Sequence, residues 1–122
     1  MPALHRNLIA ISRENYESAS ELTPHGRWNA ATNRLYYSVF QLLYMDLLEK
    51  GKLEEDTAKK HEFTDSVAEE EYGREISELF RILKRLRIDA DYKGIFIGKE
   101  KFECMKSQVD LKYDEIKRRV TA

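Results

Sequence analysis

The sequence predicts an all-α protein, an antiparallel bundle of four to five helices, on two main observations. Apolar residues recur at helical spacing along the chain, and no stretch alternates with the period of two that a half-buried strand shows. Charged residues make up 35% of the sequence and proline is rare, which favours amphipathic helices with solvated faces. At 122 residues we expect one domain, residues 1–122, built around a single core.

The longest apolar segment, residues 28–51, is expected to form the central helix. It has good helix formers and no proline, and Gly51 stands where a helix would stop. Its apolar side chains cover two sides of a helical wheel: Leu35, Val39 and Leu42 on one, and Tyr36, Phe40, Leu43 and Leu47 on the other. A helix that is apolar over most of its circumference is packed on several sides by other helices.

The segments on either side of the central helix are expected to be helices that cover it. Residues 3–20 carry apolar positions at helical spacing, and a break follows at Pro24 and Gly26. The charged segment 52–60 is expected to be a loop. Within it, Thr57 can cap a short third helix that contains His61.

Two longer helices are expected after Gly73. The apolar stripe of the first, which runs to about Tyr92, consists of Ile76, Leu79, Phe80, Leu83, Leu86 and Ala90. Residues 93–98 are expected to form a turn whose apolar side chains dock onto the bundle. Near-heptad spacing from Phe102 to Val120 predicts the last helix.

Composition excludes some classes of partner. The formal net charge of −1 gives no global attraction to nucleic acid or to an anionic membrane, although a local basic patch can still act. No segment approaches the roughly 20 apolar residues of a membrane span, and no apolar signal core is visible. The single cysteine, Cys104, is expected to be half-buried and fits a reducing compartment. We therefore expect a soluble, cytoplasmic protein without a membrane partner.

Neither a metal nor a cofactor is expected. The histidines His5, His25 and His61 lie far apart in the sequence, and none has a second histidine or cysteine at ligand spacing. No glycine-rich phosphate loop occurs, and no nucleophile motif with a base at a fixed offset.

Arg87 is the residue that composition alone does not explain, because it falls within the apolar stripe of the fourth helix. A charge directed into a core needs a partner, since an unpaired buried charge costs several kcal/mol. One interpretation is a structural ion pair with Asp91 at i,i+4, closed by a tyrosine of the central helix. The other is a guanidinium in a polar cleft that faces Asn33, Tyr36 and Tyr37, an arrangement suited to phosphate or base contact.

Three segments together resemble the HEPN domain family. Residues 30–40 (AATNRLYYSVF) resemble its second-helix signature, and residues 87–92 (RIDADY) resemble its later Arg-x-x-Ala-Asp-Tyr signature. Between them, residues 59–61 (KKH) fit a Lys-x-His segment. Their order and spacing agree with the family, and the resemblance extends over roughly residues 3–119, nearly the whole chain.

The resemblance implies an all-α bundle that commonly forms a homodimer, with the arginine segments of two chains facing one cleft. Many such domains are metal-independent endoribonucleases, often toxins encoded beside a nucleotidyltransferase antitoxin. The active members carry a histidine about four to six residues after the arginine. Here Asp91 or Tyr92 fills that place, and tyrosine, with a pKa near ~10, is a poor acid–base substitute. His61 is expected to be a helix-start or core residue and is assigned no catalysis.

Three functional hypotheses follow. The first is a HEPN-like homodimeric module without the usual histidine, which binds RNA, a nucleotide or a nucleotidyltransferase-type antitoxin; its expected ligand-binding residues are Arg87, Asn33, Tyr36, Tyr37, Asp91 and Tyr92. The second is an endoribonuclease toxin in which Arg87 is the best catalytic candidate. The third is a structural interaction domain in which the Arg87–Asp91 pair only ties helices together.

Overall fold

The computed structural model describes residues 3–53 and 59–122, and these form five α-helices and one short 3₁₀ helix. The helices are α1 (Ala3–Leu22), α2 (Trp28–Glu49), α3 (Lys60–Tyr72), α4 (Arg74–Tyr92) and α5 (Lys99–Thr121), with η1 (Thr23–His25) after α1. No strand occurs in the two described ranges, so the predicted all-α class is confirmed. The predicted helix cap at Thr57 lies outside the described residues.

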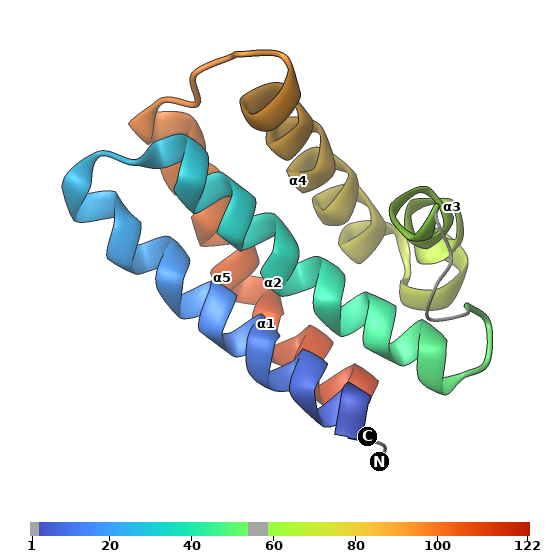
Figure 1. Cartoon of the computed structure of the whole chain (residues 1–122). Coiled ribbons are helices and arrows are strands. Elements are labelled where there is room, and N and C mark those ends of the chain that lie inside the picture. Colours follow the sequence, from blue (N-terminus) through green and yellow to red (C-terminus); the bar gives the residue numbers. More distant parts are fainter. Residues whose placement is uncertain (1–2, 54–58) are drawn as a thin grey trace.

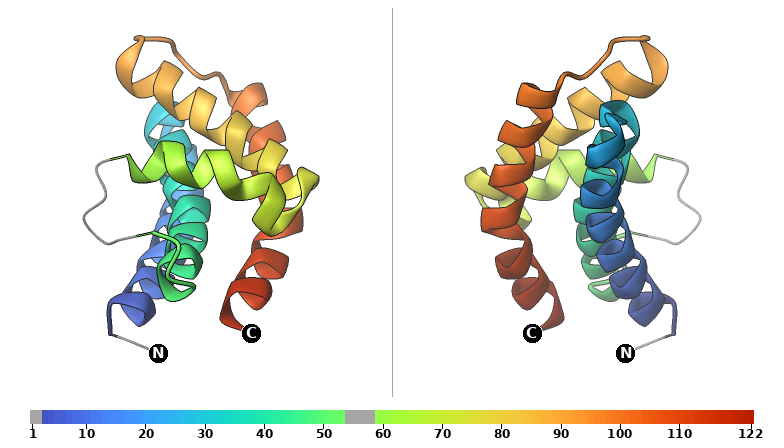
Figure 2. Two further views of the ribbon diagram at one scale, coloured as in Figure 1. Left: turned by 90° about the vertical axis from the view of Figure 1, so that its right-hand side faces the viewer. Right: turned by 90° about the vertical axis from the view of Figure 1, so that its left-hand side faces the viewer.

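The four long helices run along one another, and the short one crosses them. In Figure 1, α2 and α5 run in the same direction, while α1 and α4 run in the opposite one. Figure 2 shows α3 lying across the direction of α2. Both ends of the chain lie at the same end of the bundle (Figure 1).

The core is organised around α2, as the sequence predicts. This helix packs against α1, α3, α4 and α5. Leu35, Val39, Leu42, Leu43 and Leu47 have no exposed surface at all. Burying one such side chain contributes about 1.5–3 kcal/mol, so α2 supplies a large part of the hydrophobic stabilisation.

Glycine ends α2 where the sequence predicts a stop. Gly51 adopts a φ of 70°, the left-handed region that favours glycine. Its N–H donates to the carbonyl of Leu48 at 3.0 Å, and the N–H of Lys52 donates to the carbonyl of Leu47 at 2.9 Å. These two bonds satisfy carbonyls that the end of the helix would otherwise leave unpaired.

The segment between α4 and α5 differs from its prediction. Only Ile97 docks onto the bundle, with 2% of its surface exposed, whereas Ile95 is 44% and Phe96 is 91% exposed. Asn29 explains the difference, because its side chain bonds the carbonyl of Ile95 at 3.0 Å and the N–H of Ile97 at 2.7 Å. The main chain on both sides of Phe96 is therefore fixed, and its ring stays in solvent.

The expected half-burial of Cys104 is also wrong, since this residue is exposed. On α5 the buried residues near it are Phe102 and Met105, and Cys104 lies off their face.

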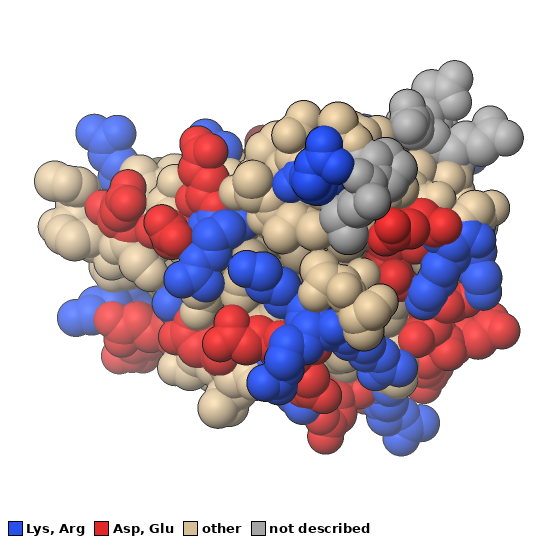
Figure 3. Space-filling view, turned by 90° about the horizontal axis from the view of Figure 1, so that it is seen from below, with Lys and Arg blue, Asp and Glu red and all other residues tan. Residues whose placement is uncertain are grey.

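The surface carries both signs of charge. On the face shown in Figure 3, Lys and Arg side chains lie interspersed with Asp and Glu side chains. None of the helices within residues 3–53 and 59–122 has the length and apolar character needed to cross a bilayer.

Candidate functional site

The site is built where α2 faces the last turns of α4. Asn33 and Tyr37 are four residues apart, so they project from one face of α2. Asn33 Nδ2 donates to Asp91 Oδ2 at 2.8 Å, and the Tyr37 hydroxyl accepts from Arg87 Nη2 at 3.1 Å. Arg87 and Asp91 are likewise four apart on α4, so two matched pairs of side chains join the helices.

Asn29 extends this row by one more turn of α2. It holds the segment after α4 through its bonds to Ile95 and Ile97. Together the three positions, Asn29, Asn33 and Tyr37, form a polar seam along α2. Asn29 was not among the residues predicted from the sequence, although its position four residues before Asn33 was a usable signal.

Arg87 is enclosed by a carboxylate and three aromatic rings. Its Nε lies 3.3 Å from Asp91 Oδ2, and Nη2 also donates to the Tyr92 hydroxyl at 3.1 Å. The Cζ atom lies 5.5, 5.3 and 5.1 Å from the ring centroids of Tyr36, Tyr37 and Tyr92. Such distances are typical of cation–π contact, which suits a guanidinium that keeps only 13% of its side-chain surface exposed.

The hydrogen-bonding capacity of Arg87 is not filled by its neighbours. Its Nε is buried and forms no hydrogen bond, because the contact with Asp91 has the distance of an ion pair without the required alignment. Within the described part of the chain, Nη1 has no hydrogen-bond partner either. A buried guanidinium normally satisfies its donors, so Arg87 retains capacity for an additional acceptor.

His61 belongs to the same cluster, although it comes from α3. Its Nδ1 lies 2.7 Å from the Tyr36 hydroxyl, and its ring stacks on Phe40 at 4.1 Å with an interplanar angle of 15°. Burial, followed by the positive charge of Arg87, lowers the pKa of His61 to about 4. The imidazole is therefore neutral near pH 7.

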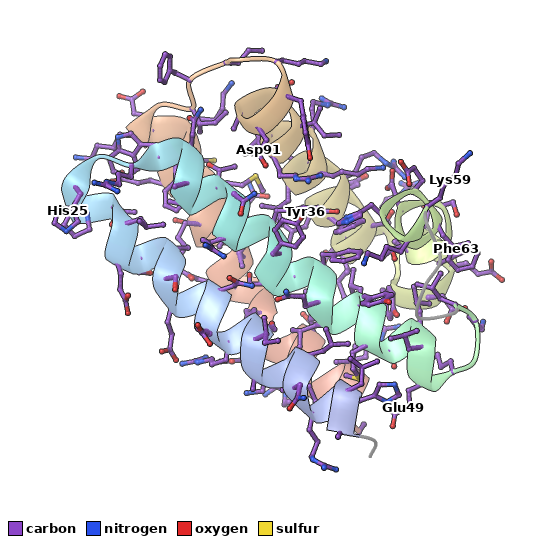
Figure 4. The ribbon with its side chains drawn as sticks, viewed as in Figure 1. His25, Tyr36, Glu49, Lys59, Phe63 and Asp91 are labelled. Carbon is purple, nitrogen blue, oxygen red and sulfur yellow. The ribbon has the colours of Figure 1, made fainter. Side chains whose placement is uncertain are left out.

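Tyr36 connects His61 to the core. It has no exposed surface, and burial raises the pKa of its hydroxyl above the ordinary value. Tyr36 thus keeps its proton, and because its hydroxyl has no other acceptor among the described residues, donation to Nδ1 of His61 is the favoured arrangement. In Figure 4 the Tyr36 ring projects from α2 toward α3 and α4, on the side of the molecule where Asp91 lies.

The structure therefore brings all six expected ligand-binding residues together and adds His61. Tyr92 is the most accessible aromatic of the cluster, with 70% of its surface exposed. Tyr36, by contrast, has no exposed surface, so a ligand cannot contact it directly. The only sequence signal for His61 was its place in the KKH segment, because nothing local indicates what a third helix will contact.

The cluster is packed with its own side chains. Three hollows in the described surface lie elsewhere: between α4 and α5, beside Phe96, and along α1 and α2. None of these three hollows is lined by Arg87, His61 or Tyr92. No group of three or more His, Cys, Asp or Glu side chains that could hold a metal occurs within the described ranges.

Comparison with known proteins gives the family. No curated protein and no solved structure matches the chain. A family model described as "HEPN domain" matches residues 5–114, which include α2, His61 and the Arg87–Tyr92 segment. This match covers nearly all of the 122 residues, and the chain accordingly belongs to the HEPN domain family.

Proposed function

We propose that this HEPN protein binds a phosphate group of RNA or of a nucleotide at Arg87. The observation that carries the proposal is the state of the guanidinium: Nη1 has no partner among the described residues, and Nε is buried without a hydrogen bond. Arginine is suited to this task because its planar donors match the oxygens of a phosphate. Asn33, Tyr37, Asp91 and Tyr92 hold the guanidinium, and Tyr36 acts through His61.

The mixed surface charge agrees with a local rather than a global site. A net charge of −1 provides no general attraction for a polyanion. Affinity therefore has to come from a few side chains positioned to contact the phosphate. We also propose that residues 1–122 act as one HEPN-like domain and form a homodimer. By family resemblance, a nucleotidyltransferase-type antitoxin is the proposed protein partner, in a toxin–antitoxin setting.

Binding is tested with a short single-stranded RNA and a matched pair of variants. Arg87→Gln removes the guanidinium, and Arg85→Gln removes an exposed arginine from the same helix with the same change in charge. We expect Arg87→Gln to weaken binding about tenfold or more, since a hydrogen bond to a charged group is worth roughly 1.5–3 kcal/mol. Arg85→Gln is expected to have little effect. Equal losses in both variants would show a nonspecific charge effect and contradict the proposal.

The second candidate is a structural role, and the enclosure of Arg87 by Asp91, Tyr37 and Tyr92 favours it. Thermal unfolding separates the two roles. A structural Arg87 predicts that Arg87→Ala lowers the melting temperature markedly while RNA affinity is absent in the wild type as well. A binding role predicts that Arg87→Ala stays folded but no longer binds RNA.

The endoribonuclease alternative depends on a group that can exchange protons beside Arg87. His61 is the described residue placed to do so, but a pKa of about 4 makes it a weak base near neutrality. Incubation of pure protein with RNA in EDTA tests this alternative. Cleavage that disappears in Arg87→Ala would support it, and intact RNA would exclude it.

The homodimer is tested by light scattering. The chain has a mass of 14.4 kDa, and we expect about twice that value across the micromolar range. A monomer mass throughout would contradict the proposed dimer.

A further inference from the structure

Two helices bring a guanidinium and an imidazole to the same pair of tyrosines. Arg87 Cζ on α4 lies 5.5 and 5.3 Å from the ring centroids of Tyr36 and Tyr37. The ring of His61 on α3 lies 5.8 Å from each of the same two centroids. The tyrosine hydroxyls are divided between them, because Tyr37 bonds Arg87 and Tyr36 bonds His61. The arrangement fixes both nitrogen-bearing groups beside one α2 face.

Each group has a donor nitrogen that none of the described residues engages. Arg87 Nη2 donates to the hydroxyls of Tyr37 and Tyr92, and Nε forms an ion pair with Asp91. Nη1 has no partner among the described residues. His61 uses Nδ1, and no described residue bonds its Nε2. The buried Tyr36 hydroxyl has no other acceptor among the described residues, which favours donation of its proton to Nδ1 and so places the hydrogen of the neutral imidazole on Nε2. Stacking on Phe40 at 4.1 Å holds the plane of the imidazole, and the contact between Nδ1 and Tyr36 holds its rotation within that plane.

The charges around these two donors are nearly balanced. Asp91 offsets Arg87 at 3.3 Å. Asp65, in contrast, is shared between Lys84 at 3.3 Å and Arg81 at 3.5 Å, so these groups carry one positive charge in excess. A neutral imidazole adds a donor without adding a charge. Such a site compensates one negative charge better than two, which favours the singly charged phosphodiester over the doubly charged terminal phosphate of a nucleotide.

We propose that Arg87 Nη1 and His61 Nε2 together bind one phosphodiester of a single-stranded RNA, with Tyr36 positioning His61. This inference rests on the proposed function and specifies it, because it names a second ligand residue and chooses an internal phosphate over a terminal one. The histidine is supplied by α3, so its contribution does not depend on the position along α4 that Asp91 and Tyr92 occupy.

Nitrogen NMR of the wild-type protein tests the proposal directly. The probe is a 2′-O-methyl RNA hexanucleotide without terminal phosphates, which cannot be cleaved through a 2′-hydroxyl. Before addition we expect His61 to show a protonated Nε2 and an unprotonated Nδ1. The probe should then shift the Nε2 signal of His61 while the signals of His5 and His25 stay in place. His25 lies in η1, far from Tyr36 in Figure 4, and serves as an internal control.

A second test compares two substitutions of His61 whose side chains differ in length. Glutamine can place its amide near the position of Nε2, whereas asparagine reaches only as far as Nδ1. We expect His61→Asn to weaken hexanucleotide binding about tenfold and His61→Gln to retain most of it, since only the former loses the outer donor. His25→Asn is the matched control and should bind as the wild type does.

The outcomes separate this inference from the function on which it rests. Binding that depends on Arg87 but leaves the Nε2 signal of His61 and the affinity of His61→Asn unchanged overturns the role of His61 and keeps the proposed function. Tighter binding of uridine 3′-monophosphate than of the hexanucleotide overturns the preference for a phosphodiester. Absence of binding by the wild type at millimolar concentrations of both probes overturns both proposals. If His61→Asn fails to fold, the wild-type spectrum still decides.

Discussion

The Tyr36 hydroxyl lies 2.7 Å from Nδ1 of His61, and this contact ties the core helix α2 to α3 beside Arg87. The phenol is completely buried, whereas the imidazole is half-buried. A group of the core thus holds the orientation of a group near the surface.

Removing the Tyr36 hydroxyl tests this contact. Tyr36→Phe keeps the ring and its packing but leaves Nδ1 of His61 without a donor, so we expect a loss of about 1 kcal/mol in the free energy of unfolding. Urea denaturation measures it. Tyr37→Phe is the control with a smaller expected loss, because Arg87 Nη2 retains the Tyr92 hydroxyl. The same loss in both variants would contradict a special contribution from the Tyr36–His61 bond.

The pH dependence of stability follows from His61. Its pKa in the folded protein is lowered to about 4 from the ordinary 6.5, so between these values the unfolded chain binds more protons. The stabilisation is complete above about pH 6.5 and is lost as the pH falls toward 4. The charged groups that act on the ring are Arg87 and Lys84 on α4 and Lys60 and Glu62 on α3.

Urea denaturation at pH 7 and at pH 4.5 measures this effect in the wild type and in His61→Gln. We expect the wild type to lose on the order of 1 kcal/mol more on acidification than the variant, a value reduced for solvent screening at the half-exposed ring. His25→Gln should follow the wild type. A variant that loses as much as the wild type would show that other groups cause the acid sensitivity.

The Arg87–Asp91 pair should contribute measurably to stability because it is partly buried. The two side chains keep 13% and 26% of their surface exposed. Asp91→Ala leaves the cation without its carboxylate and removes the acceptor of Asn33, and we expect a loss of about 1–2 kcal/mol by thermal unfolding. Asp89→Ala is the matched control. Its 3.8 Å pair with the well-exposed Lys93 should be worth less than about 0.5 kcal/mol, and a reversal of this order would be inconsistent with the geometry.

Asn29 should determine the order of the segment that follows α4. Asn29→Ala removes both of its bonds to that segment, including the acceptor of the Ile97 N–H. We expect hydrogen exchange at Ile97 to rise about tenfold or more while exchange in the middle of α5 stays unchanged. Unchanged exchange at Ile97 would show that burial of the isoleucine alone holds the segment.

Local spacing was sufficient to predict the elements and the central position of α2. The breaks at Pro24, Gly26, Gly51 and Gly73 are read from the backbone preferences of single residues. The Arg87–Asp91 pair was also predictable, because residues four apart on a helix are neighbours in any tertiary fold.

Long-range contacts required the tertiary structure. Periodicity shows which face of a helix is buried, but it does not show which helix covers that face. The crossing of α3 over α2 therefore decided that His61 meets Tyr36, 25 positions away along the chain. In the same way, the two bonds from Asn29 decided that Phe96 remains exposed while Ile97 is buried. Phe96 and Ile97 are both hydrophobic, so the sequence alone does not show which of the two is buried.

The sequence by itself thus determined an all-α HEPN chain with an arginine that needs partners, because helix formation and i,i+4 pairing depend on neighbours along the chain. Only the tertiary structure decided which partners Arg87 has, which of its donors remain unused, and that a histidine from another helix stands beside it. These features depend on how helices cross, and many side chains far apart in the sequence determine that crossing together.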